Sequence, residues 1–173
     1  MPDKIKERDA GKTIQEKANV LWDVANSLAG LYKPHEYGLV ILPMAVVKRF
    51  HDCLLPTYAK VQKEFQAKKH LQVREAFLRK ASGYNFYNTS KFTFETLLAD
   101  AKNIGSNFRD YLNGFPDNVR DVLEQMKFED QIATMEKGGV LYQVISDFNS
   151  SKADMSPDKV ATNDMGYIFE NLV

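Results

Sequence analysis

The chain has 173 residues, of which 44% are hydrophobic and 27% charged, the balance of one globular domain with its own core. Its single cysteine, Cys53, excludes an internal disulfide. The longest apolar run, residues 38–47, is shorter than the roughly 18–20 residues that cross a membrane. Residues 1–12 are charged and precede no apolar stretch, so we expect no signal peptide. These features predict a cytoplasmic protein that does not enter a membrane.

Charge is unevenly distributed along the chain. Residues 1–80 hold 15 basic and 9 acidic residues, whereas residues 81–173 hold 8 and 14. This asymmetry predicts a surface that faces a polyanion such as DNA, with an ordinary solvated helix–loop–helix as the alternative. The basic excess is densest between residues 60 and 80, and its candidate phosphate contacts are Lys60, Lys63, Lys68, Lys69, Arg74, Arg79 and Lys80.

The first predicted helix runs from about Thr13 to Ala29. Apolar residues between Val20 and Leu31 recur at spacings of one, three and four, which is the stripe of an amphipathic helix. Gly30 is a suitable stop. The polar residues 1–12 before it are expected to be frayed or disordered.

The second predicted helix is the central one of the domain. Residues 37–55 are apolar nearly all round, and their length favours a helix that is buried on most sides. A short strand over residues 39–42 is the alternative. Pro43 interrupts the segment, so the helix either kinks there or begins a new first turn.

The basic stretch, residues 57–80, is helical in composition and ends at Ser82-Gly83. An aromatic loop follows, whose rings interleave with amide and basic groups. The rings of such a loop can stack on unpaired bases, but more often they pack against a helical core. We favour packing against the core. The weaker candidates for partner or DNA contact are Tyr84, Asn85, Phe86 and Tyr87.

The second half of the chain predicts a series of short helices. Thr93 can cap the first of them, although Glu95 and Thr96 make an imperfect capping box. The expected helices cover residues 94–102, 106–113, 118–126, 130–137 and 140–148, with a loop over residues 149–158. No segment alternates with period two, so the fold class is all-α: a compact multi-helix bundle over residues 13–162. The amphipathic residues 164–173 indicate a docked last helix or the start of a linker, residues 163–173, into a further domain.

The chain lacks the common catalytic motifs. Its nine glycines form no G-x-G, so neither a dinucleotide loop nor a P-loop is present. Its three histidines, His35, His51 and His70, have no spacing that suits a metal site. His51, Asp52 and Cys53 are adjacent, and neighbouring residues on a helix point in different directions, so we expect no triad and a core role for Cys53. An independent helical enzyme is therefore the weakest interpretation.

Six parts of the chain carry a family pattern in the expected order. They are residues 21–30, 36–52, 84–94, 103–105, 141–145 and 164–172. The first is similar to "LW..AD.LRG" and the second to "EY..VIL...FLKR.SD". Together they resemble the N-terminal domain of the modification subunit of type I restriction–modification systems. Pro43, Asn26 and Ala29 depart from the pattern, which usually has an apolar or small residue, Asp and Arg at these positions.

The resemblance implies a non-catalytic helical domain of a DNA (adenine-N6) methyltransferase subunit. In that family a following domain binds S-adenosylmethionine through a glycine-rich loop and the flipped adenine through an Asn-Pro-Pro-aromatic motif. Neither motif occurs here, so no cofactor is expected in this chain. The family's helical domain helps to clamp DNA, is implicated in sensing methylation, and assembles with the specificity subunit, the second modification subunit and the restriction subunit. A helical protein-interaction domain without DNA contact is the alternative.

Overall fold

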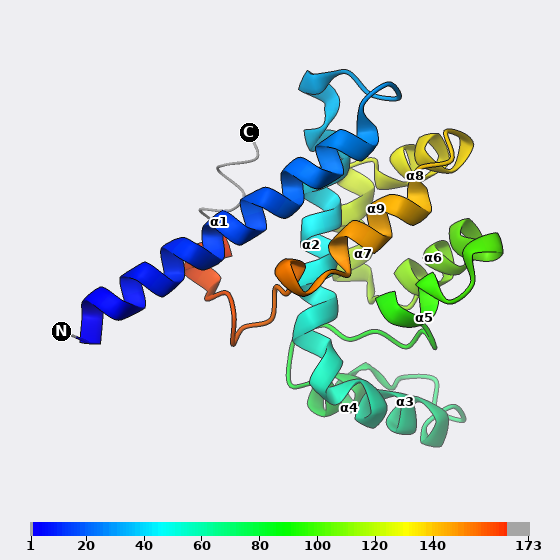
Figure 1. Ribbon diagram of the computed structural model, residues 1–173. Coiled ribbons are helices and arrows are strands. Elements are labelled where there is room, and N and C mark those ends of the chain that lie inside the picture. The colour runs from blue at the N-terminus through cyan, green and yellow to red at the C-terminus, as the bar shows by residue number, and fades with distance from the viewer. Residues whose placement is uncertain (1, 166–173) are drawn as a thin grey trace.

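The computed structural model describes the backbone of residues 2–165 and the side chains of residues 14–165 (Figure 1). This part of the chain is helical and contains no strand, which confirms the all-α fold class. The α-helices are α1 (Pro2–Leu28), α2 (Gly38–Leu54), α3 (Tyr58–Ala67), α4 (Glu75–Ser82), α5 (Phe94–Leu98), α6 (Ile104–Asn113), α7 (Asp117–Gln125), α8 (Phe128–Lys137) and α9 (Leu141–Phe148). Short 3-10 turns are η1 (Pro34–Glu36), η2 (Leu55–Thr57), η3 (Ala101–Asn103) and η4 (Ser151–Ala153).

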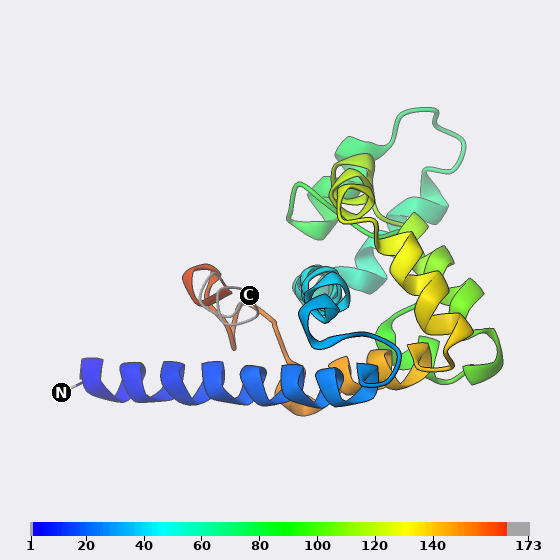
Figure 2. The same cartoon turned by 90° about the horizontal axis from the view of Figure 1, so that it is seen from above.

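Helix α1 begins at Pro2, which differs from the predicted start at Thr13 and from a frayed segment over residues 1–12. Proline is favoured in the first turn of a helix, and Asp3 suits the positive end of the helix dipole. The residues that follow are mostly good helix formers. The N-terminal part of α1 extends beyond the rest of the molecule (Figure 2), so intrinsic propensity rather than packing accounts for it.

Helix α2 is the predicted central helix and continues through Pro43 without a break. Residues 39–42 lie inside it, which excludes the strand alternative. It contacts α1, α8 and α9, which surround it in Figure 1. Because neighbours cover most of its sides, Val40, Met44 and Val47 are completely buried.

The main core joins α1, α2 and the helices from α5 to α9. Its centre is aromatic: the Phe94 ring lies 6.4 Å from Phe108 and 6.0 Å from Tyr111, both edge-to-face. A separate small core of Val61, Leu78, Ala81 and Tyr87, with Phe65 against it, holds α3 to α4. The residues from Tyr58 to Ser82 therefore form a hairpin, called the basic hairpin below, which lies at the lower end of Figure 1.

Helix α5 has the N-cap that the sequence predicts. Thr93 Oγ1 accepts a hydrogen bond from the Thr96 backbone N–H at 3.3 Å, and Thr96 Oγ1 accepts one from the Thr93 N–H at 2.8 Å. A threonine hydroxyl thus completes the capping box where a Glu or Gln carboxyl or amide is usual. The helix ends at Leu98, earlier than the predicted Lys102, and η3 follows it.

Residues 149–165 form a strap that returns along α1 and α2 (Figures 1 and 2). The sequence predicts an ordinary loop over residues 149–158, but Ala153, Met155 and Val160 are completely buried. Residues 162–165 are helical, and the remainder of the predicted last helix lies outside the described residues. The strap is therefore part of the core and not a surface connection.

Basic side chains hold the strap by its backbone carbonyls. Arg49 Nη1 donates to the carbonyls of Met155 and Val160, each at 2.7 Å. Lys17 Nζ donates to the Lys152 carbonyl at 2.6 Å, and burial lowers the pKa of this lysine. Both helices that flank the strap thus fix its path with hydrogen bonds to charged donors, which are stronger than bonds between neutral groups.

A buried ion pair on α2 completes this attachment. Lys48 Nζ lies 2.5 Å from Asp52 Oδ2 and donates to the Ala153 carbonyl at 3.3 Å, while Asp52 Oδ2 accepts from the Met155 N–H at 2.8 Å. Burial would raise the pKa of the Asp52 carboxyl, but hydrogen bonds from His51, Lys48 and Met155 and the Lys48 charge together lower it. The carboxylate is therefore stabilised in its ionised form.

His51 and Asp52 contact each other, although neighbouring residues on a helix generally point in different directions. His51 Nδ1 lies 2.8 Å from Asp52 Oδ1, and His51 Nε2 accepts the Phe94 N–H at 3.1 Å. Because Nε2 accepts a hydrogen bond, Nδ1 carries the ring N–H and donates a hydrogen bond to the Asp52 carboxylate. The pair thus joins α2 to the start of α5. Cys53 is buried, and burial raises the pKa of its thiol, as suits a core residue.

Candidate nucleic-acid interface

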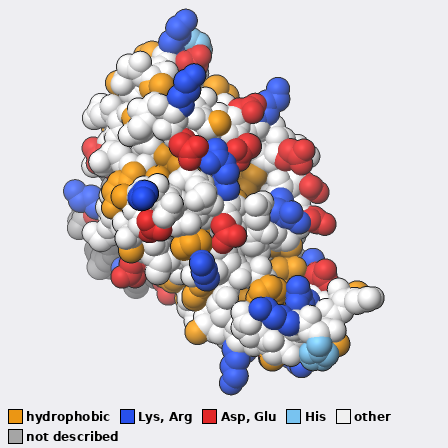
Figure 3. All heavy atoms as spheres, turned by 90° about the vertical axis from the view of Figure 1, so that its right-hand side faces the viewer, with side chains coloured by type: hydrophobic (Ala, Val, Ile, Leu, Met, Phe, Trp, Pro, Cys, Tyr) orange, Lys and Arg blue, Asp and Glu red, His pale blue; other side chains and the backbone are white. Residues whose placement is uncertain are grey.

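All seven basic residues that the sequence singles out lie on the basic hairpin. The expected single helical stretch over residues 57–80 divides into α3, a connecting loop and α4, and Leu78 of α4 packs against Val61 of α3. The hairpin forms the lower lobe of Figure 3, where blue, orange and pale blue side chains are mixed. Exposed among the seven are Lys60, Lys63, Lys69, Arg79 and Lys80, whereas Lys68 and Arg74 are half-buried.

Three of these cations lie over aromatic rings of the hairpin. Arg74 Cζ is 4.6 Å and Lys69 Nζ is 5.9 Å from the centre of the Phe65 ring, and Lys68 Nζ is 4.9 Å from the centre of the Phe77 ring. Cation–π contacts at exposed sites contribute about 0.5–1 kcal/mol. They orient the charged groups while leaving N–H donors available to a ligand. Phe65 and Phe77 are not among the residues that the sequence singles out, although their helical spacing from the basic residues is visible in the sequence.

The aromatic loop is mostly packed against the two cores, in line with the interpretation that the sequence favours. Tyr87 belongs to the small core of the hairpin, and the Phe86 ring lies 4.6 Å from that of Phe50 on α2. Tyr84 stacks on Phe86 at 5.0 Å and is 36% exposed. Asn85 is exposed. Tyr84 and Asn85 therefore remain accessible to a partner, while the two rings after Asn85 hold the loop in place.

The far end of this loop fits closely against the end of α6. Asn88 is buried, donates from Nδ2 to the Tyr111 carbonyl at 2.9 Å, and accepts the Ser90 N–H at 2.7 Å. Gly114 lies so close that a Cβ atom there would be 2.6 Å from Ser90 N. The loop thus holds the basic hairpin in a fixed position relative to α6 and α7.

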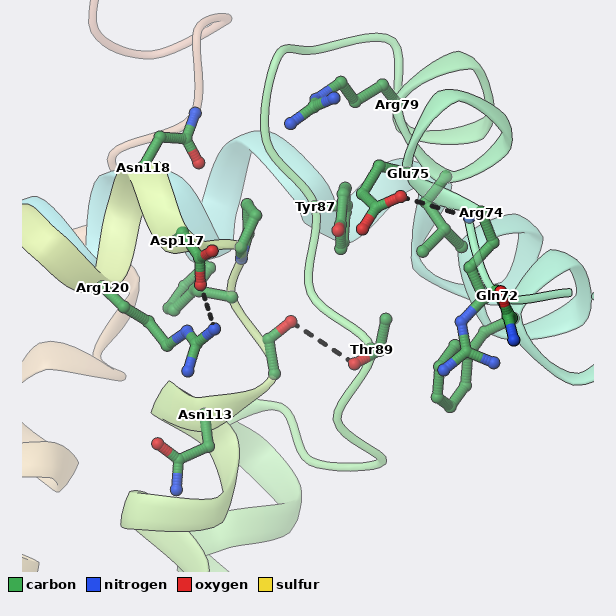
Figure 4. A pocket seen from close by; sticks show the side chains of 15 residues that line it. Gln72, Arg74, Glu75, Arg79, Tyr87, Thr89, Asn113, Asp117, Asn118 and Arg120 are labelled. Carbon is green, nitrogen blue, oxygen red and sulfur yellow. Dashed lines mark hydrogen bonds and ion pairs between the residues drawn. The ribbon is translucent and has the colours of Figure 1, made fainter. Parts of the chain in front are cut away.

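A cleft of about 460 Å³ lies between the basic hairpin and the turn from α6 to α7 (Figure 4). Arg74 and Arg79 lie on its hairpin side, and Arg120 of α7 lies across the opening. Sequence reasoning missed Arg120, because it stands 40 positions beyond Lys80 among acidic neighbours and only the fold brings it to the hairpin. The other polar residues at the cleft are Gln72, Glu75, Thr89, Asn113, Asp117 and Asn118.

Comparison with known families agrees with this architecture. A family model described as the HsdM N-terminal domain matches residues 17–148. The chain belongs to this family. The HsdM domain is the N-terminal domain of the modification subunit of type I restriction–modification systems. No curated protein and no solved structure matches the chain. In the described part of the HsdM domain, no helix is both long and apolar enough for a membrane span.

The structure explains the family-like motif at residues 47–52. Lys48, Arg49 and Asp52 are the residues that hold the strap, which begins where the family match ends at Phe148. Two residues that depart from the family pattern are exposed: Asn26 on α1 and Ala29 directly after its end. The motif around residues 164–172 extends beyond the described residues. The HsdM domain therefore couples its central helix to the chain segment that follows the domain.

Proposed function

We propose that the HsdM domain is a non-catalytic clamp that contacts the DNA backbone through the basic hairpin. The observation that carries this proposal is the placement of seven basic side chains on one protruding hairpin, with only Glu64 and Glu75 as acidic residues on it. Lysine and arginine that neutralise DNA phosphates release counterions, and this supplies affinity without reading sequence. The hairpin would thus position the subunit on the duplex.

The remainder of the proposal follows from family membership. The HsdM domain would precede a methyltransferase domain that binds S-adenosylmethionine and methylates adenine at N6. The specificity subunit would choose the target, and a second modification subunit and the restriction subunit would complete the assembly in the cytoplasm. The fixed path of the strap supports this role, since a rigid exit from the clamp would orient the domain that follows.

Salt dependence of DNA binding tests the proposal. We expect the chain to bind a non-specific duplex weakly, with an affinity that falls steeply with KCl, measured by fluorescence anisotropy. The triple variant Lys60→Ala/Lys63→Ala/Lys80→Ala removes exposed cations that pack on no ring. It should reduce the magnitude of the negative slope of log K against log [KCl] by about 1–3, because each lost phosphate contact reduces that magnitude by about 0.9.

A matched variant removes three exposed lysines elsewhere, Lys102→Ala/Lys137→Ala/Lys159→Ala. Its slope should equal that of the unaltered chain, so the effect depends on position and not on net charge. Equal slopes for both triple variants, in the chain and in the assembled modification complex, would reject DNA contact by the hairpin.

The alternative function is protein interaction without DNA contact, and one observation favours it. An apolar groove of about 650 Å³ lies between α1 and α2. Trp22 at its edge is 70% exposed and Leu39 is 49% exposed. Exposed apolar patches of this kind mark interaction sites. This function would be supported if the domain assembles with its partners while the lysine substitutions on the basic hairpin leave the salt dependence of DNA binding unchanged.

A further inference from the structure

The loop that joins α3 to α4 has cations at both of its ends. Lys68 and Lys69 directly follow α3, and Arg74 directly precedes α4. Between them the chain reads His-Leu-Gln-Val. Helix α3 runs away from the end of α2, so this segment, residues 68–74, lies at the outer end of the basic hairpin (Figure 1). We call it the hairpin loop.

Apolar side chains at this end of the hairpin are open to solvent. Val73 of the hairpin loop is 74% exposed, and Phe77 on α4 is 44% exposed. Gln72, beside Val73, is exposed as well. The small core that holds the hairpin together uses other residues, so Val73 is free to contact a partner. Such a contact would remove apolar surface from water, which is favourable.

Cation–π contacts bring the two ends of the hairpin loop together. Lys69 Nζ, from the start of the loop, and Arg74 Cζ, from its end, lie over the same Phe65 ring, at 5.9 Å and 4.6 Å from its centre. Gln72 and Val73 stand between these two cations in the chain. Closely spaced cations beside an exposed aliphatic side chain suit a partner whose anions flank a less polar surface.

We propose that the hairpin loop enters the minor groove of the DNA duplex, with Val73 in the groove and Lys69 and Arg74 at the phosphates of its two edges. Proteins that bind the minor groove combine Arg, Lys, Asn or Gln with apolar side chains. This groove is roughly 6 Å wide and suits a loop with short side chains, whereas the major groove, roughly 12 Å wide, admits a helix. The inference rests on the proposed function and assigns a groove and an apolar contact to it.

Replacing Val73 separates the apolar contact from the electrostatic one. Val73→Ser should weaken binding to an A·T-rich duplex roughly fourfold or more, the effect of losing one buried methyl group, without changing the salt slope. Fluorescence anisotropy of the chain and of the assembled modification complex measures both quantities. Val122→Ser, at an exposed position of α7, is the matched control and should bind as the unaltered protein does.

Replacing the two cations should have the opposite pattern. The double variant Lys69→Gln/Arg74→Gln should reduce the magnitude of the salt slope by about 1.8, because two phosphate contacts are lost and each accounts for about 0.9. Circular dichroism confirms that the variants are folded. A change in slope caused by Val73→Ser, or unchanged binding by this variant, would overturn the proposed contact of Val73.

Competition with small groove-binding cations identifies the groove. Distamycin, which fills the minor groove of A·T-rich DNA, should weaken binding of the unaltered protein several-fold and weaken binding of Val73→Ser less. Methyl green, a cation that occupies the major groove, should have little effect. Equal competition by both compounds, or competition by methyl green alone, would overturn the assignment to the minor groove.

The two proposals fail in different ways. If the Lys60, Lys63 and Lys80 triple variant changes the salt slope while Val73→Ser and distamycin leave binding unchanged, the minor-groove inference is wrong and the hairpin clamp stands. If Val73→Ser weakens binding to phosphatidylserine vesicles but not to DNA, the hairpin loop contacts an anionic membrane surface instead, and the inference is wrong. If none of these variants affects DNA binding, both proposals are wrong.

Discussion

Replacing Asp52 with alanine should lower the free energy of unfolding by about 3–5 kcal/mol, the usual cost of breaking a buried ion pair. Asp52 is 6% exposed and accepts hydrogen bonds from Lys48, His51 and the Met155 N–H. Its loss would leave the Lys48 ammonium buried without a counter-charge. Urea denaturation, followed by circular dichroism, measures the change.

Two further variants show whether the cost comes from the orphaned charge. The double variant Lys48→Met/Asp52→Leu removes both charges and should recover part of the loss, since apolar replacements of buried pairs are often tolerated. Asp23→Ala, at an exposed position of α1, should change stability by less than about 0.5 kcal/mol. A cost below about 1 kcal/mol for Asp52→Ala would contradict the role given to this pair.

Replacing Phe94 with alanine should destabilise the domain by about 3–5 kcal/mol, the range for removing a buried phenylalanine. Phe94 is completely buried, and its ring lies against Phe108, Tyr111 and, at 4.6 Å, His51. The cavity would therefore open at the junction of α2, α5 and α6. The midpoint of urea denaturation should fall, with little change in its slope.

Tyr84→Ala is the contrasting variant in the aromatic loop. Tyr84 is 36% exposed and stacks on Phe86, so we expect a loss of about 1 kcal/mol, the range for an aromatic pair. Equal costs for Phe94→Ala and Tyr84→Ala would contradict the placement of Phe94 in the main core and of Tyr84 on the accessible side of the aromatic loop.

The sequence predicts those structural features that depend on residues close together along the chain. The apolar segment that becomes α2, the Thr93 cap and the packed aromatic loop are all visible from local spacing and residue type. The start of α1 is not, because weak propensities add up over many residues and residues 1–12 lack an apolar stripe. The basic hairpin is intermediate: its composition shows the charge, but its small core depends on Tyr87 from the following loop.

Contacts between distant segments could not be predicted from one sequence. The strap looks like an ordinary loop, because nothing local shows that Arg49 will bind carbonyls more than 100 positions away. Likewise, nothing in the local sequence marks Arg120 as a neighbour of the basic hairpin, because it stands near Asp117 and Asp121. His51 and Asp52 meet although they are adjacent on α2. His51 also accepts the Phe94 N–H and Asp52 also accepts the Met155 N–H, both from distant parts of the chain. In each case tertiary packing determines the partner.

Lysine footprinting tests most directly whether the basic hairpin lies on DNA. The assembled modification complex is acetylated with and without duplex DNA at low salt, and mass spectrometry then gives the modification rate of each lysine. We expect slower acetylation of Lys60, Lys63 and Lys80 in the presence of DNA and unchanged rates at Lys102, Lys137 and Lys159. Equal rates at the three hairpin lysines with and without DNA would contradict it.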